Sequence, residues 1–170
     1  MRSILHHTSL YMLTLILWLL AVIATVIFAV YSGYCSAEWR RASATWFTSY
    51  PEAGSEECIE YNGCAWEGSF AAVKGKQTEE WVKDHNIAAV HEKFFDEYKG
   101  KWLTIRDRST GKEMNVQVLD MCSDKDCNDC CTRNMKDTGF LIDLEKYTAQ
   151  RFNGSLLNKG MIIVEWKIKE

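Results

Sequence analysis

The chain opens with one long apolar segment, and shorter alternating runs follow it. From Leu10 to Val30 there are 21 consecutive residues without a charge. A helix of that length covers about 31 Å, and the hydrocarbon core of a bilayer is roughly 30 Å thick. A cleaved signal peptide is the alternative, but its apolar core usually runs about 7–15 residues, and no Ala-x-Ala cleavage site follows this segment. The pattern therefore predicts an uncleaved membrane-spanning helix at residues 10–31, after a short tail at residues 1–9.

The rest of the chain is predicted to be one domain at residues 43–170, joined to the apolar segment by a linker at 32–42. Runs rich in β-branched and aromatic residues, alternating or continuously apolar, indicate strands. The predicted strands cover residues 44–48, 87–90, 102–106, 114–119 and 160–168. Turn residues between the third and fourth of these runs predict a hairpin with a longer loop.

Two segments of this domain have helical patterns. Thr78 is a suitable N-cap for a short helix at 79–83. A second stretch at 144–152 carries apolar residues at helical spacing, and Asp143 or a nearby residue is expected to open it. The predicted fold class is therefore mainly β with one or two short helices, preceded by a single transmembrane helix.

Composition excludes some classes of function. The net charge is −3 and the pI about 5.8, whereas a nucleic-acid binder normally has a basic surface. One proline and 12% aromatic residues argue against a disordered chain. The hydrophobic fraction of 47% includes the apolar segment, so it overstates the core of the soluble domain.

The cysteines favour an oxidising compartment for the soluble domain. Six of the seven lie within it, and an even number in a compact domain is typical of disulfides and unusual in the cytosol. The charges that flank the apolar segment give no clear orientation, so we expect the domain on the extracytosolic or lumenal side from its cysteines. The glycosylation sequon at Asn153 is consistent with this side, and Cys35 is the odd cysteine near the membrane. The six cysteines are Cys58, Cys64, Cys122, Cys127, Cys130 and Cys131.

The Cys-rich loop at 122–131 also permits metal-binding interpretations. Cys127 and Cys130 have the Cys-x2-Cys spacing of a zinc knuckle, but a second knuckle is missing. The acidic run from Asp124 resembles the start of a calcium loop, yet it lacks the glycine and the final glutamate of that motif. We therefore expect no metal or cofactor, and we favour disulfides that join this loop to the Cys58–Cys64 region. Adjacent cysteines are expected to bond to different partners.

Several motifs follow one another in an order that resembles a known family. One strand ends in Val-Leu-Asp-Met-Cys at 118–122. A Leu-Ile-Asp-Leu-Glu segment at 141–145 opens a predicted helix, and a strand begins with a glycine at 160–167. Segments 44–47 and 87–90 match the family's first and central strands. This order resembles the six-stranded double-psi β-barrel shared by expansins, barwin-like proteins, family-45 endoglucanases and rare-lipoprotein-A-like proteins, and it covers most of the predicted domain.

The resemblance implies roles for two aspartates. Asp143 matches the family aspartate that acts as general acid in the hydrolases and is needed for wall loosening in expansins. Asp120 matches a second aspartate that faces the same groove. Glycosidic cleavage needs a carboxyl that stays protonated, and a neighbouring carboxylate raises its pKa. In the hydrolases the base comes from the first strand, where this chain has Thr45, Thr48 and Tyr50 but no acid. That departure favours an expansin-like or lytic activity over hydrolysis.

A structural interpretation of the same residues stays open. Asp143 is also suited to cap its helix, and Asp120 to accept backbone N–H groups at a strand end. Thr45, Trp46 and Tyr50 are predicted to bind substrate, with the two aromatic rings stacking on sugars. Aromatic side chains of a small β domain are nevertheless more often part of its core.

Two hypotheses of function result. The first is a membrane-tethered, expansin-like module that binds, loosens or lyses a cell-wall polysaccharide, with Asp143 carrying any glycan-cleaving activity. The alternative is a non-catalytic assembly protein, a membrane-anchored minor component of a cell envelope or of a virion, between internal membrane and capsid. The expected partners are a lipid bilayer at residues 10–31 and either a polysaccharide or proteins of such an assembly, and not nucleic acid.

Overall fold

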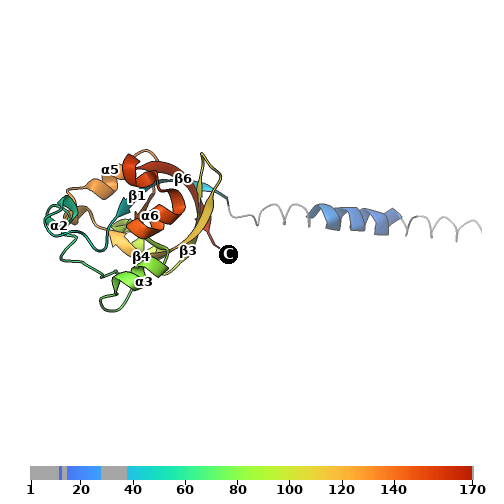
Figure 1. Ribbon diagram of the computed structural model, residues 1–170. Coiled ribbons are helices and arrows are strands. Elements are labelled where there is room, and N and C mark those ends of the chain that lie inside the picture. Colours follow the sequence, from blue (N-terminus) through green and yellow to red (C-terminus); the bar gives the residue numbers. More distant parts are fainter. Residues whose placement is uncertain (1–11, 13–14, 28–37, 170) are drawn as a thin grey trace, which may run out of the picture. The chain divides into compact units, whose positions relative to one another are not determined.

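Residues from Trp39 onward form a closed barrel of six strands (Figure 1). The computed structural model describes residues 12, 15–27 and 38–169 of the chain. The strands are β1 Arg40–Phe47, β2 Ile87–His91, β3 Trp102–Asp107, β4 Glu113–Cys122, β5 Leu141–Glu145 and β6 Ile162–Ile168. All five predicted strands are present, and the third and fourth predicted runs form the expected hairpin of β3 and β4.

The pairing of the strands has an internal two-fold relation. Their order around the barrel is β1-β5-β2-β4-β3-β6. The pairs β1–β5 and β2–β4 are parallel, and the other four pairs are antiparallel. Exchanging β1, β2 and β3 with β4, β5 and β6 leaves every neighbour and every direction unchanged. The barrel thus consists of two interlocked halves of like topology, which is the double-psi arrangement that the motifs predicted.

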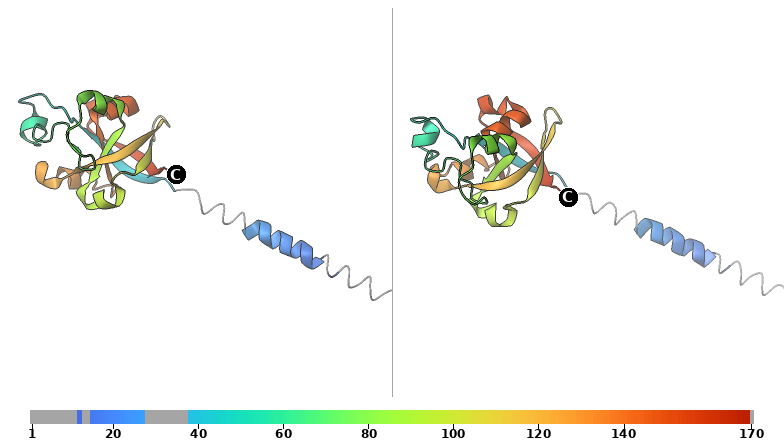
Figure 2. Two further views of the ribbon diagram at one scale, coloured as in Figure 1. Left: turned by 90° about the horizontal axis from the view of Figure 1, so that it is seen from below. Right: turned by 60° about the horizontal axis from the view of Figure 1, so that its bottom comes forward.

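Short helices connect the strands, and there are more of them than the one or two predicted. Between Trp39 and Lys169 there are six α-helices and one 3-10 helix. They are α2 Glu56–Ile59, α3 Glu79–Asp84, α4 Glu92–Tyr98, η1 Asp124–Asp126, α5 Cys130–Asn134, α6 Lys146–Asn153 and α7 Leu156–Lys159. Helices α2 and α5 lie at the end of the barrel away from the C-terminus, as the views in Figures 1 and 2 agree.

The helix predicted at 144–152 starts later than its apolar spacing indicates. Leu144 and Glu145 belong to β5, and α6 begins at Lys146. Glu145 is its N-cap, because its side chain accepts a hydrogen bond from the backbone N–H of Tyr147. Asp143 lies inside the strand, so the interpretation of Asp143 as a helix cap is wrong. The N-cap predicted for α3 is confirmed, since Thr78 accepts from the N–H of Trp81.

Alternation along the strands separates the inside of the barrel from its outer face. Ala44 of β1, Ala88 and Val90 of β2, and Ile142 and Leu144 of β5 belong to the main core and are fully buried. Residues between them on each strand have side chains on the opposite face. The outer face of β1, β2 and β5 is therefore the one that carries the candidate chemistry.

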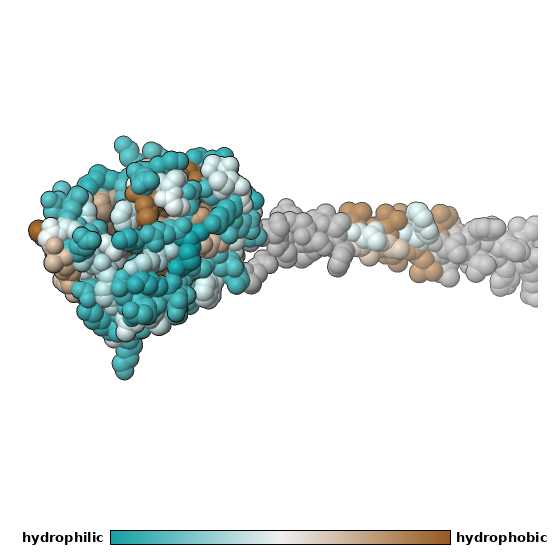
Figure 3. Space-filling model, viewed as in Figure 1, coloured by the Kyte–Doolittle hydropathy of each residue, from teal (hydrophilic) through white to brown (hydrophobic). Residues whose placement is uncertain are grey.

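The apolar segment at the start of the chain is described only in part. Residues 12 and 15–27 are helical, and the remaining positions of the predicted span at 10–31 lie outside the described residues, as does Cys35. The large apolar side chains of this helix, Trp18 among them, are exposed (Figure 3). No helix among the described residues has both the length and the apolar character needed to cross a membrane.

The barrel begins slightly earlier than the predicted domain. Strand β1 starts at Arg40 and Ala42 is fully buried in the main core. These positions were predicted to be the end of the linker at 32–42.

Candidate functional site

Four adjacent strands place Thr45, Asp143, Ala89 and Asp120 in one row. In the register, Asp143 is opposite Thr45 of β1 on one side and opposite Ala89 of β2 on the other. Ala89 is in turn opposite Asp120 of β4. Residues directly opposite one another share a face of the sheet. The two aspartates are therefore two strand spacings apart, about 9–10 Å between backbones, with only the methyl group of Ala89 between them.

A β-bulge in β4 puts Asp120 into this row. Ala88 is opposite Val118, but the next residue, Ala89, is opposite Asp120, so Leu119 is the extra residue. Without the bulge, Leu119 would lie opposite Ala89. Bulges re-aim side chains in this way and are over-represented beside active sites.

Asp143 is a carboxyl that holds its proton up to neutral pH. Its burial raises the pKa to about 7, and the charge of Asp120 adds to this effect. The hydroxyl of Thr45 acts in the opposite direction, since it donates to Oδ1 of Asp143 at 2.6 Å and stabilises the charged form. The side chain keeps part of its surface open to solvent. Asp143 can therefore both hold a proton near pH 7 and reach a ligand.

Asp120 loses its proton at lower pH than Asp143. Burial raises the pKa of Asp120 to about 6, although the backbone N–H groups of Ala71 and Met121 lower it. The N–H of Ala71 donates to Oδ1 at 3.0 Å. Asp120 does accept a backbone hydrogen bond, as the structural interpretation holds, and the donor comes from a loop 49 residues away in the sequence.

Glu57 of α2 is a third carboxyl near this row, and sequence reasoning missed it. Burial raises the pKa of Glu57 to about 7, and the charge of Asp143 adds to the increase. The position of α2 comes from local contacts: Ser55 caps the helix and Cys58 is bonded to Cys64. The N–H of Gly63 donates to the carbonyl of Glu57 at 2.8 Å. The helix-start pattern at Ser55 was visible in the sequence, but nothing in it indicates proximity to Asp143.

The three predicted substrate-binding residues lie in different surroundings. Thr45 touches Asp143, as described above. Trp46 is the next residue of β1, so it alternates to the other face and packs against the main core. Tyr50 packs against a second core cluster that includes Phe70, and its hydroxyl donates to the carbonyl of Gln77.

Exposed aromatic side chains occur instead on the loop that connects the carboxyls. This loop runs from Glu57 to Ala71, and within it Trp66 is 59% exposed and Tyr61 37% exposed. Ile59 on the same segment is 68% exposed. Figure 3 shows hydrophobic side chains on the surface at the end of the barrel that carries α2. These aromatic rings are free to contact a ligand, in contrast to Trp46.

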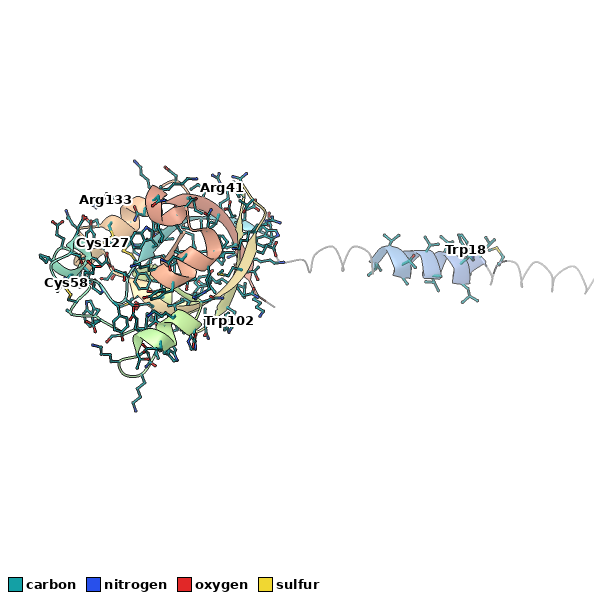
Figure 4. All side chains as sticks on the ribbon, viewed as in Figure 1. Trp18, Arg41, Cys58, Trp102, Cys127 and Arg133 are labelled. Carbon is teal, nitrogen blue, oxygen red and sulfur yellow. A yellow bond between two sulfur atoms is a disulfide. The ribbon has the colours of Figure 1, made fainter. Side chains whose placement is uncertain are left out.

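The disulfide pairing differs in part from the expected one. Cys58 is bonded to Cys64 (Figure 4) within its own loop. The other two bonds, Cys122–Cys131 and Cys127–Cys130, both lie within the Cys-rich loop. The expectation that disulfides join the two regions is therefore wrong. The expectation that the adjacent cysteines bond to different partners is confirmed.

The predicted glycosylation site Asn153, and also His91, are engaged in hydrogen bonds. The side-chain nitrogen of Asn153, the atom that would carry a glycan, donates to Oδ2 of Asp107 at 2.6 Å. His91 is buried, and its Nδ1 accepts from the N–H of Lys93. Its Nε2 lies 2.9 Å from the hydroxyl of Thr132 and 3.2 Å from Asp124. Asn153 is thus part of a structural contact, and His91 connects β2 to the Cys-rich loop.

Comparison with known proteins gives matches of low identity. No family model matches the chain. No curated protein matches it either. Among solved structures, a papain inhibitor from Streptomyces has 13% identity and a TM-score of 0.47, and the match covers 78% of this chain and 96% of that one.

Two other solved structures have similar values. An expansin from Clavibacter michiganensis has 14% identity and a TM-score of 0.47, over 78% of this chain and 51% of that one. Cerato-platanin 3 from M. perniciosa has 17% identity and a TM-score of 0.44, over 76% of this chain and 94% of that one. The closed six-stranded barrel and its two-fold strand pairing give this chain the double-psi β-barrel fold.

Proposed function

We propose that the barrel binds a cell-wall polysaccharide over the row from Thr45 to Asp120, and that Asp143 donates a proton to a glycosidic oxygen. The observation that carries this proposal is the pair of carboxyls on either side of Ala89, with pKa values of about 7 and about 6. Between those values Asp143 is mostly protonated and Asp120 mostly ionised. A site of this kind offers an acid and a base to one substrate at the same pH.

The strand spacing between Asp143 and Asp120 is close to the separation that cleavage of a glycosidic bond requires of two carboxyl groups. Inverting glycosidases hold their two carboxyl groups about 6.5–9.5 Å apart, which leaves room for a water molecule. Two strand spacings give about 9–10 Å between the backbones of Asp143 and Asp120. Glu57 supplies a further carboxyl, close enough to Asp143 for the charge of Asp143 to raise its pKa. The lack of an acid in β1 therefore does not deprive the site of a second carboxyl.

Binding of the polysaccharide would depend on the exposed aromatic rings of the loop from Glu57 to Ala71. Sugars present apolar faces that stack on aromatic side chains and hydroxyls that accept and donate hydrogen bonds. Trp66 and Tyr61 are the exposed rings between Glu57 and Ala71. They take the role that the sequence assigned to Trp46 and Tyr50.

The proposal includes a tether at residues 10–31 that holds the barrel at the extracytosolic face of a membrane. It is supported by the 21 residues without charge and by the exposed apolar side chains at 15–27. Three disulfides in the barrel suit an oxidising compartment. The tether would confine the activity to wall material close to that membrane.

The test uses the full chain in detergent micelles with insoluble cellulose, chitin and peptidoglycan. Co-sedimentation measures binding, and mass spectrometry measures released fragments. Asp143→Asn should abolish fragment release and leave sedimentation and the circular dichroism spectrum unchanged. Asp96→Asn is the matched control, because the Asp96 side chain is 93% exposed on α4. Equal release by wild type and Asp143→Asn would rule out the role of Asp143.

The assembly function is the second candidate, and the exposed apolar loop favours it. Ile59, Tyr61 and Trp66 together form a surface suited to a protein partner as well as to a sugar. A stoichiometric, regularly repeated location of the chain in an envelope or capsid, seen by electron tomography, would support this function. Sedimentation with a polysaccharide that depends on Trp66 would count against it.

A further inference from the structure

A second group of reactive side chains lies at the end of the barrel that carries α5. The Sγ atoms of four cysteines lie within 4.8 Å of one another. They are Cys122, Cys127, Cys130 and Cys131. The first ends β4 and the second follows η1, while the last two open α5. This cluster, here called the four-sulfur cluster, takes no part in the proposed polysaccharide site.

We propose that the four-sulfur cluster has two redox forms, a pair of disulfides when oxidised and a zinc site with four thiolate ligands when reduced. The sequence has no second Cys-x2-Cys pair beside Cys127 and Cys130. The fold supplies the missing ligands differently, because it brings Cys122 and Cys131 to the sulfurs of Cys127 and Cys130.

The distances between sulfurs of different disulfides fit a tetrahedral zinc site. Zn–S bonds of about 2.3 Å place neighbouring sulfurs of a tetrahedron about 3.8 Å apart. The Sγ of Cys131 lies 3.6 Å from that of Cys127 and 3.9 Å from that of Cys130. Three of the four sulfurs thus already have a contact at ligand spacing, and rotation of the reduced side chains would complete the set.

The backbone around the cluster is shaped for close approach of the cysteines. Asn128 and Asp129 both have φ in the left-handed region, at 50° and 62°. Asparagine and aspartate tolerate this region better than other residues with a side chain. The chain turns back there, and the N–H of Cys130 donates to the carbonyl of Cys127 at 3.2 Å. This turn therefore has a backbone hydrogen bond in addition to the bond between the two sulfurs.

A polar clamp holds the loop by contacts that do not involve sulfur. The N–H of Thr132 donates to Oδ1 of Asp124 at 2.9 Å, and its hydroxyl donates to Oδ2 at 2.6 Å. His91 of β2 contacts both residues through Nε2. The clamp therefore joins η1, α5 and the barrel, and it is expected to keep the four cysteines together after reduction.

The surroundings of the sulfurs also suit a bound metal. Cys131 is fully buried and Cys127 is 8% exposed. They pack with Met135 and Leu141, and with Phe94 from α4. An apolar shell limits the access of water and of competing ligands to a metal. The shell would serve either redox form of the cluster.

The interconversion has a defined balance. Two molecules of a dithiol reductant transfer four electrons and four protons to the two disulfides, and each dithiol closes to its own disulfide. Zinc binding then releases the protons of the four thiols to solvent, because thiolates are the ligands. A disulfide oxidant reverses the process and frees the zinc. The Cys-rich loop would then stay cross-linked by disulfides in an oxidising compartment and by zinc in a reducing compartment.

The experiment uses the full chain in detergent micelles. It is reduced with excess dithiol, freed of the reductant without air, incubated with zinc and desalted. We expect one zinc per chain by elemental analysis, and full release on oxidation with oxidised glutathione. In a parallel sample, cobalt should give the visible bands of a tetrahedral thiolate site. Reduced chain that keeps its circular dichroism spectrum but holds no zinc would overturn the proposal.

Variants locate the metal. The double variant Cys58→Ser, Cys64→Ser should still bind one zinc per chain, whereas Cys131→Ser should bind at least tenfold more weakly. If Cys131→Ser does not fold, alkylation of the reduced wild type with and without zinc gives the same information by mass spectrometry. Protection of the four cluster cysteines supports the site. Protection of Cys58 and Cys64 instead would refute it.

Discussion

Asp143 and Asp120 lie on either side of Ala89, each directly opposite it in the register of a neighbouring strand. Both aspartates belong to the half of the barrel made of β4, β5 and β6, and Ala89 of β2, from the other half, lies between them. The bulge at Leu119 is needed for this arrangement. The positions of the two carboxyls therefore depend on the correct pairing of the strands. Their effects on stability and their pKa values can be measured without knowledge of the substrate.

Asp143→Asn should make the barrel more stable at pH 8 and less sensitive to pH. Folding raises the pKa of Asp143 from 3.8 to about 7. A carboxyl of this kind contributes stability below pH of about 4, and that contribution is lost as the pH rises through about 7. The full shift corresponds to about 4 kcal/mol. We expect about 1–2 kcal/mol, because the side chain is partly open to solvent.

Urea denaturation of the full chain at pH 5 and pH 8 measures this effect. Wild type should lose free energy of unfolding between the two values, and Asp143→Asn should lose less. Asp96→Asn, which changes an exposed carboxyl on α4, should follow wild type. Equal losses in wild type and Asp143→Asn would mean that Asp143 is ionised in the folded protein at pH 5.

Thr45→Val should raise the pKa of Asp143 further above about 7. The hydroxyl of Thr45 donates to Oδ1 of Asp143 and stabilises the ionised form, so its loss favours the protonated form. Valine is β-branched like threonine and keeps the strand geometry. The carboxyl carbon shift of Asp143, followed by NMR against pH, measures the pKa directly. A midpoint that moves to lower pH would contradict the hydrogen bond as described.

Gly63→Ala should destabilise the domain and displace Glu57. A Cβ at Gly63 would lie 2.7 Å from the carbonyl oxygen of Glu57 and 3.2 Å from the ring of Pro51. Overpacking of this kind costs about 1–3 kcal/mol. The matched control is Gly154→Ala, whose Cβ would meet only the carbonyl of Gln150 at 3.9 Å. The midpoint of thermal unfolding should be lower for Gly63→Ala than for Gly154→Ala. Equal midpoints would show that α2 can move to accommodate the added methyl group without loss of stability.

Most of the barrel could be predicted because its strands are defined by local alternation. The hairpin of β3 and β4 needs only neighbouring residues. Strand β5 was not among the strands predicted from local pattern, since Leu144 fits a helical stripe as well as a strand. Its pairing with Trp46, far away in the sequence, decides in favour of the strand. The sequence pattern around Leu144 cannot predict its pairing with Trp46.

The candidate site also contains residues that sequence motifs indicate and residues whose role depends on contacts between distant parts of the chain. Asp143 and Asp120 stand in recognisable motifs, so they could be singled out. The charge of Asp143 raises the pKa of Glu57 although the two residues are far apart in the sequence, and the sequence around Glu57 resembles an ordinary helix start. The partners of the six cysteines depend on which sulfurs the fold brings together, and spacing alone left them open.

Asn153→Ala should weaken the barrel at neutral pH and have less effect in acid. The pKa of the buried Asp107 is lowered: burial alone would raise it, but donors from Ser109 and Asn153 outweigh that effect. A carboxyl with a lowered pKa contributes stability above its unfolded pKa of about 4, and this contribution is lost as the pH falls through the folded value. Loss of the hydrogen bond from Asn153 should cost about 1–3 kcal/mol at pH 7.

Thermal unfolding of wild type and Asn153→Ala at pH 7 and at a series of lower pH values tests this. The difference between the two midpoints should shrink once the pH falls through the lowered pKa of Asp107, because protonated Asp107 gains less from the donor. Asn158→Ala, at an exposed position of α7, serves as the control and should match wild type throughout the series. If Asn153 instead carries a glycan, wild type from a glycosylating host should be heavier by a sugar chain, and its amide would be committed to the glycan rather than to Asp107. A difference between the midpoints that grows in acid would contradict the lowered pKa of Asp107.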